Sequence, residues 1–279
     1  MHELAAKQVL LDIELITLIA LGIGVGVYAW LRRKAVIESP GSGHFDGYDV
    51  ALMFFPALLF LLNPVSQLML AHSVEVAEPA DKNGISPLLF NVAYFAFVGL
   101  MVYGIVEWVR GRQVVEVFGL NTLSFPKIVI GSILGGVASV LICVGLIGNL
   151  SQSLLEGIFD GLAEQEPVRS LQEADSVLYL ALSIFNACVA AAVVEEFLFR
   201  GYMYGALKQA TNKVFAMVVV GALFAVVHGN LPALLPLWAF SILLCLAYEW
   251  TRCLWVSIGI HAFFNATNIV LMLVEQPVE

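Results

Sequence analysis

The chain has 279 residues, of which 60% are hydrophobic and only 13% are charged, whereas soluble domains carry about 25% charged residues. This composition excludes an ordinary soluble domain and predicts an integral membrane protein. The formal net charge of −9 also argues against nucleic acid as a partner, because proteins that bind nucleic acid carry basic patches that attract its phosphates.

Eight apolar segments are long enough to cross a bilayer, which takes about 20 residues of helix. In chain order they are 11–31, 50–71, 87–109, 128–150, 176–200, 214–230, 231–250 and 254–274. The sixth and seventh segments are separated only by Gly229–Pro232, which predicts a tight turn. The sequence therefore predicts an all-α, polytopic membrane protein with about eight transmembrane helices.

The basic residues near the ends of these segments indicate the orientation, since Lys and Arg are enriched in cytoplasmic loops. Apart from Arg200, which lies inside the motif region, nine of the twelve basic residues fall on connections from odd-numbered to even-numbered segments: Arg32, Arg33, Lys34, Arg110, Arg112, Lys127, Lys208, Lys213 and Arg252. The opposite side holds Lys7, Lys82 and Arg169. This division predicts that the odd-to-even connections are cytoplasmic and that both termini lie outside.

The segment Glu195-Glu196-Phe-Leu-Phe-Arg200 places three charges inside one of the most apolar stretches of the chain. Charged side chains in membrane segments are costly and usually serve a function in the protein interior. Glu196 and Arg200 are four residues apart, so they share a helix face and are expected to pair. Glu195 points about 100° away around the helix, which leaves it free for chemistry. The alternative is a purely structural network of buried ions.

Two further pairs of residues follow at the same helical spacing. Phe224 and His228 share a face of the next helix, and His228 reaches the depth of Glu195 if both segments are continuous antiparallel helices. A carboxylate and an imidazole at one depth can share a water. On the last helix His261 and Asn265 donate hydrogen bonds from one face, which suits an oxyanion hole; hydrogen bonding between helices is the alternative. Together these residues suggest hydrolysis within the membrane.

At these residues the chain resembles the CPBP family of intramembrane proteases, which includes type II CAAX prenyl endopeptidases and bacteriocin-processing or self-immunity proteins. The family motif E-E-x-x-x-R matches Glu195–Arg200, F-x-x-x-H matches Phe224–His228, and H-x-x-x-N matches His261–Asn265. The resemblance covers about Val177–Leu271. It implies an intramembrane endopeptidase that hydrolyses peptide bonds of a membrane-associated or lipidated protein or peptide.

The resemblance also implies a role for each motif residue. The catalytic residues would be a water-activating Glu195 assisted by His228, and the oxyanion donors His261 and Asn265; the supporting residues would be Glu196, Arg200 and Phe224. This glutamate-based chemistry needs no cofactor, and no H-E-x-x-H pair supplies metal ligands on one helix. A zinc ion held by Glu195, His228 and His261 is the alternative.

A non-catalytic membrane scaffold or bacteriocin self-immunity protein of the same fold is the alternative function. All three motifs are intact, which disfavours a decayed enzyme but leaves room for a protein that acts by binding. A transporter is disfavoured because the sequence contains no visible internal repeat and its membrane charges cluster at one site.

The expected organisation is one integrated membrane domain with two regions. Residues 1–125 are expected to form an N-terminal three-helix region with a cytoplasmic interfacial segment at Val114–Leu123, and residues 126–279 to form the CPBP-type catalytic core. The expected partners are the lipid bilayer and a membrane-associated peptide or protein substrate. The expected location is the plasma membrane of a bacterium or an archaeon.

The distribution of basic residues yields a topology prediction. Reporter domains fused after Lys34 and after Arg112 should both read as cytoplasmic, because Lys and Arg near helix ends favour the cytoplasmic side. Paired cytoplasmic and external reporters at each fusion point provide the measurement. An external reading at both positions would reverse the predicted orientation.

Overall fold

The computed structural model describes residues 45, 47–53, 55–57, 59–60, 85–156, 176–230 and 232–274. The regular elements in this part of the chain are all helices, so the all-α prediction is confirmed. In chain order they are α2 (Gly47–Leu52), α4 (Ile85–Gly104), η1 (Ile105–Val109), α5 (Val114–Val117), α6 (Phe125–Ser139), η2 (Val140–Gly148), α7 (Asn149–Glu156), α9 (Val177–Phe185), η3 (Asn186–Ala191), α10 (Ala192–Glu195), η4 (Glu196–Tyr204), α11 (Gly205–Ala210), α12 (Lys213–Val226), α13 (Leu234–Thr251) and α14 (Leu254–Val274), where η denotes a π-helical stretch. The predicted span 11–31 and most of the span 50–71 lie outside the described residues.

Several of these elements join into longer helices that are suited to a bilayer. In the described part of the chain, five helices are long and apolar enough to cross a membrane: Ile85–Val109, Phe125–Ser153, Val177–Ala210, Leu234–Thr251 and Leu254–Val274. They overlap the third, fourth, fifth, seventh and eighth predicted spans. The prediction of a polytopic membrane protein is therefore confirmed.

The sixth predicted span, 214–230, differs from the structure. Helix α12 has only 14 residues, which is fewer than the roughly 20 that a bilayer crossing needs. Gly229 adopts a left-handed φ of 58°, a conformation that commonly follows the end of a helix. The Asn230 side chain then accepts a hydrogen bond from the Ala233 backbone N–H at 3.1 Å. His228 consequently lies just beyond the helix rather than within it.

The fifth predicted span extends beyond its expected end at Arg200. The structure has one helix of 34 residues that ends at Ala210, about 50 Å long at 1.5 Å per residue. The chain continues as helix through Arg200 because that side chain is fully buried and ion-paired, so it marks no membrane boundary. Glu195 lies near the middle of this helix, directly before the π-helical stretch η4. Such stretches are rare and frequently occur at functional sites.

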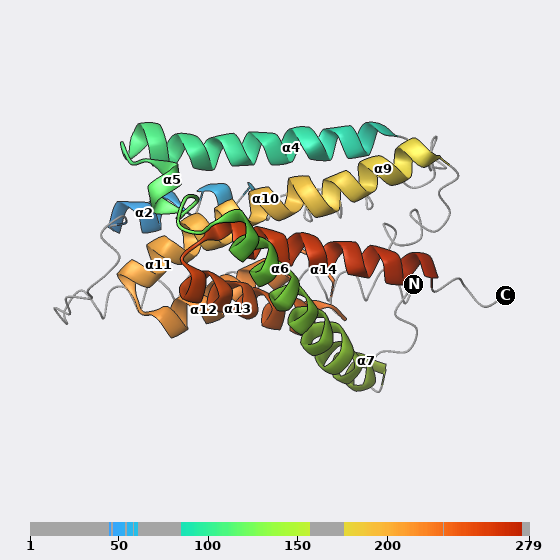
Figure 1. Ribbon diagram of the computed structural model, residues 1–279. Helices are drawn as coiled ribbons and strands as arrows, with labels where there is room; N and C mark the ends of the chain where they lie inside the picture. The colour runs from blue at the N-terminus through green and yellow to red at the C-terminus, as the bar shows by residue number, and fades with distance from the viewer. Residues whose placement is uncertain are drawn as a thin grey trace, which may run out of the picture.

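Helix α14 occupies a central position in the bundle. Figure 1 shows α4 alongside α9, the neighbouring helices α12 and α13, and α6 crossing α14. The crossing is close because α6 presents glycines to α14: a Cβ added at Gly135 would lie 2.4 Å from Ile260 Cδ1, and one at Gly136 would lie 2.5 Å from Phe263 Cδ1. Small residues let membrane helices approach closely. The approach fixes α14, which carries the third motif.

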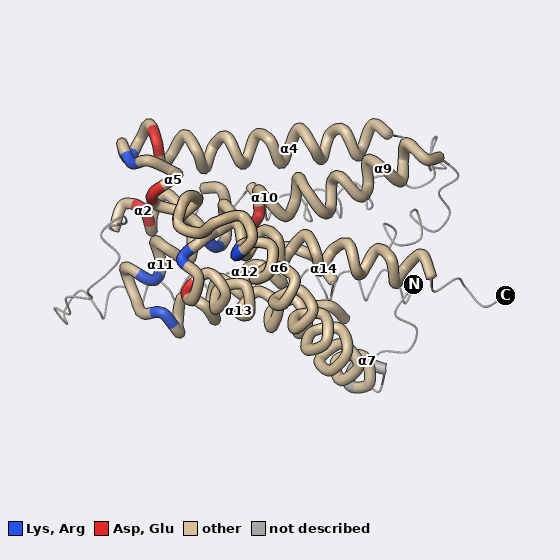
Figure 2. Tube along the Cα trace, viewed as in Figure 1, with Lys and Arg blue, Asp and Glu red and all other residues tan. Residues whose placement is uncertain are grey.

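Charged residues gather at the end of the bundle where α2, α5 and α11 lie (Figure 2). Two buried carboxylates there pair with basic residues: Asp49 with Arg110 and Arg112, and Glu249 with Lys208, Lys213 and Arg252. Five of the nine basic residues predicted to be cytoplasmic therefore lie at one end. The side of the membrane that this end faces stays a prediction.

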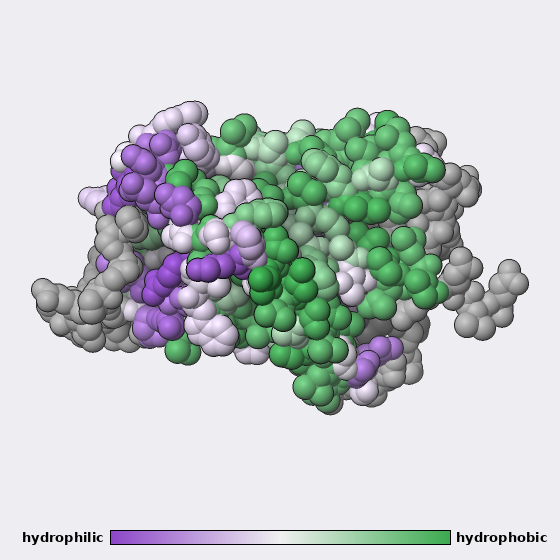
Figure 3. Space-filling view, viewed as in Figure 1, coloured by the Kyte–Doolittle hydropathy of each residue, from purple (hydrophilic) through white to green (hydrophobic). Residues whose placement is uncertain are grey.

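The lateral surface of the bundle is apolar. Figure 3 shows hydrophilic residues concentrated at the charged end and a broad hydrophobic face over the helices beyond it. Large apolar side chains are exposed on this surface, among them Phe90, Leu100, Ile130 and Leu134. Exposed apolar faces of this extent mark membrane or protein interaction sites. Together with the five long apolar helices, this face indicates an integral membrane protein.

The predicted interfacial segment Val114–Leu123 is helical only over the single turn of α5. Val117 and Phe118 are buried against the bundle, so the apolar side chains of this segment pack on protein. The following turn contacts the connection between α13 and α14: the Leu254 N–H donates to the Phe118 carbonyl at 3.2 Å. Gly119 has a φ of 63°, and a Cβ there would lie 1.9 Å from the Arg252 carbonyl oxygen.

Replacing this glycine should destabilise the protein. In Gly119→Ala, the left-handed backbone alone costs about 1–2 kcal/mol, and contact with the Arg252 backbone adds to that cost. Gly145→Ala is the matched control, because Gly145 is helical and has open space around its Cβ position, where alanine favours the helix. Thermal unfolding in detergent should show a lower Tm for Gly119→Ala only; equal Tm values would contradict the docking of this turn.

Candidate active site

The three motifs meet where the long helix Val177–Ala210 packs against α12, α13 and α14. The motif residues are distributed over these elements: Glu195 ends α10, Glu196 and Arg200 lie on η4, Phe224 lies on α12, His228 follows α12, and His261 and Asn265 lie on α14. All of these helices except α12 are long enough to cross a membrane. The motif side chains therefore come together within the helical bundle.

The Glu196 carboxylate is the centre of a buried ionic network. Its Oε1 atom accepts hydrogen bonds from Arg200 Nη1 at 2.9 Å and from His261 Nδ1 at 2.9 Å. Because a carboxylate oxygen can only accept, His261 Nδ1 carries the hydrogen. Arg200 Nη2 donates to Ser241 Oγ at 2.7 Å. The predicted pairing of Glu196 with Arg200 is confirmed, and the network also joins α13 and α14 to the first motif.

Phe224 connects the second motif to this network. Its ring lies under the Arg200 guanidinium, with Cζ 4.3 Å from the ring centroid, which stabilises the cation through the negative face of the ring. The same ring contacts the His228 imidazole at 4.7 Å and the His261 imidazole at 5.8 Å between centroids. Phe224 is fully buried. It therefore holds both histidines beside the neutralised arginine.

Glu195 stands apart from the network, as its predicted direction on the helix requires. The residue is 7% exposed, and its Oε2 atom has no hydrogen-bond partner among the described residues. His261 Nε2 lies 3.9 Å from this oxygen. This distance is too long for a hydrogen bond. Glu195 is thus a buried carboxylate that retains an acceptor for another group.

Glu195 and His228 line one cavity, as expected from their similar depth. The cavity measures about 110 Å³, and its other lining residues are Phe60, Tyr94, Phe95 and Val227. This volume is sufficient for water, since one molecule occupies about 30 Å³ in the liquid. His228 Nδ1 lies 2.6 Å from the Phe224 carbonyl oxygen. Because a carbonyl only accepts, Nδ1 is the donor, and Nε2 of the neutral imidazole remains an acceptor.

The third motif makes different contacts from those expected of an oxyanion hole. Asn265 Nδ2 donates to the Ala187 carbonyl oxygen at 2.8 Å, which ties α14 to η3. His261 donates from Nδ1 to Glu196 and turns Nε2 toward Glu195. Neither side chain lines the cavity that contains Glu195 and His228. This geometry positions helices and the two carboxylates, while the oxyanion role of His261 and Asn265 stays a prediction.

The alternative zinc site would need Glu195, His228 and His261 around one metal ion. Over the described ranges, no three His, Cys, Asp or Glu side chains gather closely enough to hold a metal ion. The alternative ligands Glu195, His228 and His261 are therefore not assembled as a three-ligand site in this conformation. The two histidines instead use their Nδ1 atoms on protein oxygens.

The sequence did not predict two residues that belong to the site. Ser241, which accepts from Arg200, lies in the apolar run of α13 without a motif partner. Tyr94 lies on α4, far upstream of the three motifs, yet it lines the cavity beside Glu195. Only the packing of distant helices reveals either residue, because no spacing along the chain links them to Glu195 or Arg200.

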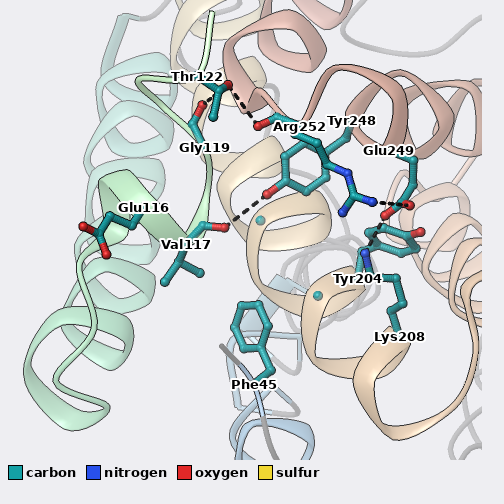
Figure 4. Close-up of a pocket in the computed structure, with 12 residues that line it drawn as sticks. Phe45, Glu116, Val117, Gly119, Thr122, Tyr204, Lys208, Tyr248, Glu249 and Arg252 are labelled. Carbon is teal, nitrogen blue, oxygen red and sulfur yellow. Dashed lines mark hydrogen bonds and ion pairs between the residues drawn. The ribbon is translucent and has the colours of Figure 1, made fainter. Parts of the chain in front are cut away.

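A second and larger cavity, of about 220 Å³, lies at the charged end. Figure 4 shows Lys208, Arg252, Glu249, Tyr204 and Tyr248 along one side of it. The buried Glu249 carboxylate pairs with Lys208 at 2.5 Å and with Arg252 at 3.7 Å. The opposing charges balance within the cavity wall, and no motif carboxylate or histidine lines it. Its chemistry is that of a structural ion cluster, so the smaller cavity is the candidate active site.

Comparison with known proteins agrees with the site. The family model "Type II CAAX prenyl endopeptidase Rce1-like" matches residues 177–267, which include all three motifs. The part of the chain that carries the three motifs is therefore similar to type II CAAX prenyl endopeptidases. The chain is also similar to "Putative membrane peptidase YdiL" of Bacillus subtilis (strain 168), with 32% identity over 101 residues, 36% of this chain and 41% of that protein. No solved structure matches the chain.

The unequal surroundings of the two carboxylates predict unequal effects on stability. Glu196→Gln should lower stability by about 3–5 kcal/mol, because it leaves the buried Arg200 charge unpaired. Glu196→Gln combined with Arg200→Gln should recover part of the loss. Glu195→Gln should unfold near the parent temperature, since Glu195 Oε2 has no hydrogen bond to lose within the described ranges.

Thermal unfolding in one detergent compares all three variants with the parent. A Glu195→Gln variant that melts as low as Glu196→Gln would show that the carboxylate assignment is wrong. If the double variant is no more stable than Glu196→Gln, the unpaired Arg200 charge is not the cause of the lost stability.

Proposed function

We propose that this chain is an intramembrane endopeptidase that hydrolyses a peptide bond with a water activated by Glu195. The observation that carries the proposal is the contrast between adjacent carboxylates. Glu196 pairs with Arg200 and accepts a hydrogen bond from His261, whereas Glu195 is buried, lines a cavity and has one oxygen without a hydrogen-bond partner among the described residues. Burying an additional carboxylate is costly, so a chemical use accounts for Glu195 better than a structural one.

The first step would be an attack by water on the peptide carbonyl. A water in the cavity transfers one proton to Glu195 Oε2 while its oxygen bonds to the carbonyl carbon. The carbonyl π electrons move to the carbonyl oxygen, which becomes an oxyanion. A carboxylate and an imidazole within reach of one water are suited to such general-base catalysis. His228 Nε2 is the second acceptor at this cavity and would orient the same water.

Collapse of the tetrahedral intermediate would complete the reaction. The oxyanion re-forms the carbonyl, the carbon–nitrogen bond breaks, and the proton held by Glu195 passes to the leaving nitrogen, directly or through His228. The products are a carboxylic acid and an amine, and Glu195 returns to its carboxylate form. No acyl-enzyme forms, because water rather than a Ser or Cys side chain attacks. His261 would orient both carboxylates during this cycle.

The match to the family model supports a membrane-associated or lipidated substrate. The family model that matches residues 177–267 is described as a CAAX prenyl endopeptidase, so a C-terminal peptide with a prenylated cysteine is the first candidate. Phe60, Phe95 and Val227 give the cavity wall apolar surface, which suits a peptide that approaches from the bilayer. A non-catalytic scaffold or self-immunity protein has no comparable need for the free Glu195 oxygen.

The test replaces the proposed base. Glu195→Gln should lower the cleavage rate about 10²–10⁴-fold, the range for loss of general-base catalysis, without loss of folded protein. The probes are a fluorogenic peptide that ends in a farnesylated C-a-a-X sequence and the same peptide without the farnesyl group. A comparison of peptides released from membranes by the parent and by Glu195→Gln extends the search to other substrates.

Two arms of this experiment separate the alternatives. Tyr103→Phe is the control, because Tyr103 lies on α4 but does not line the cavity; it should cleave at the parent rate. A chelator should leave the rate unchanged, and loss of activity that one equivalent of zinc restores would favour the metal mechanism. No Glu195-dependent cleavage of any probe or membrane protein would favour the scaffold.

A further inference from the structure

The cavity at Glu195 has walls from two different regions of the chain. Glu195, Val227 and His228 lie within residues 177–267, the part that matches the family model. The opposite wall consists of Phe60, Tyr94 and Phe95, which precede that part. Tyr94 is the only one of these three with a polar side-chain atom. The region outside the family match therefore contributes one hydrogen-bonding group to the site.

The Tyr94 hydroxyl shares two properties with Glu195 Oε2, namely burial and the lack of a hydrogen-bond partner among the described residues. Both atoms are buried, and neither has a hydrogen-bond partner in the part of the chain that the structure describes. Leaving a buried polar group unsatisfied costs about 1–3 kcal/mol. Two such atoms on residues that line one cavity point to a common partner that enters it, namely water or a substrate.

A packing role explains the Tyr94 ring but not its hydroxyl. The ring contacts Phe60 at 5.8 Å and Phe95 at 6.0 Å between centroids, and phenylalanine would make the same contacts. The hydroxyl adds a neutral donor with a pKa that is ordinarily near 10, so it stays protonated near neutral pH. A neutral donor in an apolar cavity is suited to stabilise charge that develops during a reaction.

We propose that Tyr94 is a further catalytic residue, whose hydroxyl donates a hydrogen bond to the carbonyl oxygen of the scissile peptide as that oxygen gains negative charge. The inference rests on the proposed function of Glu195. The two donors that the sequence suggested are engaged: Asn265 Nδ2 bonds to the Ala187 carbonyl and His261 Nδ1 bonds to Glu196. Tyr94 keeps its own proton throughout, so the proton balance of the hydrolysis is unchanged.

The test is Tyr94→Phe, which removes one oxygen and keeps the ring. The kcat for the best-cleaved of the two fluorogenic peptides should fall about 10²–10³-fold, as for loss of one oxyanion donor. The KM should stay near that of the parent, because the interaction forms only as charge develops. The Tm should not fall, since the hydroxyl has no hydrogen-bond partner to lose among the residues that the structure describes. Tyr103→Phe on the same helix should change neither kcat nor Tm.

The outcomes separate this inference from the proposed function. If Glu195→Gln loses cleavage while Tyr94→Phe cleaves like the parent, the role of Tyr94 is overturned and the protease stands. A raised KM with unchanged kcat would overturn it too, because that pattern belongs to ground-state binding. A lower kcat that accompanies a lower Tm would indicate packing and count against it. If the parent cleaves nothing in a Glu195-dependent way, both proposals fall.

Discussion

The hydrogen bonds of one carboxylate oxygen organise the interior of this protein. Glu196 Oε1 accepts from Arg200 and from His261 at 2.9 Å each, deep within an apolar helical bundle. An unpaired guanidinium there would be strongly destabilising, so the helices must meet in the arrangement that keeps this contact. Arg200 extends the constraint to α13 through Ser241. The relative rotation of the first-motif helix, α13 and α14 follows from this network.

The network gives two adjacent glutamates opposite properties. Glu196 is committed to Arg200 and His261, while Glu195, one residue earlier, turns toward a cavity. The change from α10 to the π-helical stretch η4 occurs between them, and π-helical turns are typical of sites where a local helix distortion serves function. Phe224 adds a cation–π contact to Arg200 and packs against both histidines. The supporting residues thereby leave Glu195 Oε2 without a hydrogen-bond partner in the described part of the chain.

Close helix packing maintains the site from a distance. Because Gly135 and Gly136 of α6 have no Cβ atom, Ile260 and Phe263 of α14 can pack directly against the α6 backbone. His261 lies between these two residues on α14. At the charged end, the turn at Gly119 docks on the Arg252 carbonyl at the start of the same helix. Asn265 then ties α14 to η3. These contacts determine how deeply His261 enters and where its two nitrogens point.

The sequence by itself determined the membrane class, most of the described spans and the pairing of Glu196 with Arg200. These features depend on apolar run length and on the i, i+4 geometry of a helix, which are local properties. It misplaced the end of the fifth span because a run of residues does not reveal that Arg200 is neutralised. The tertiary structure alone decided that His261 bonds to Glu196, that His228 lies beyond α12, and that Tyr94 and Ser241 join the site. Those facts depend on the rotation, depth and close approach of helices far apart in the chain, and no spacing within one helix encodes them.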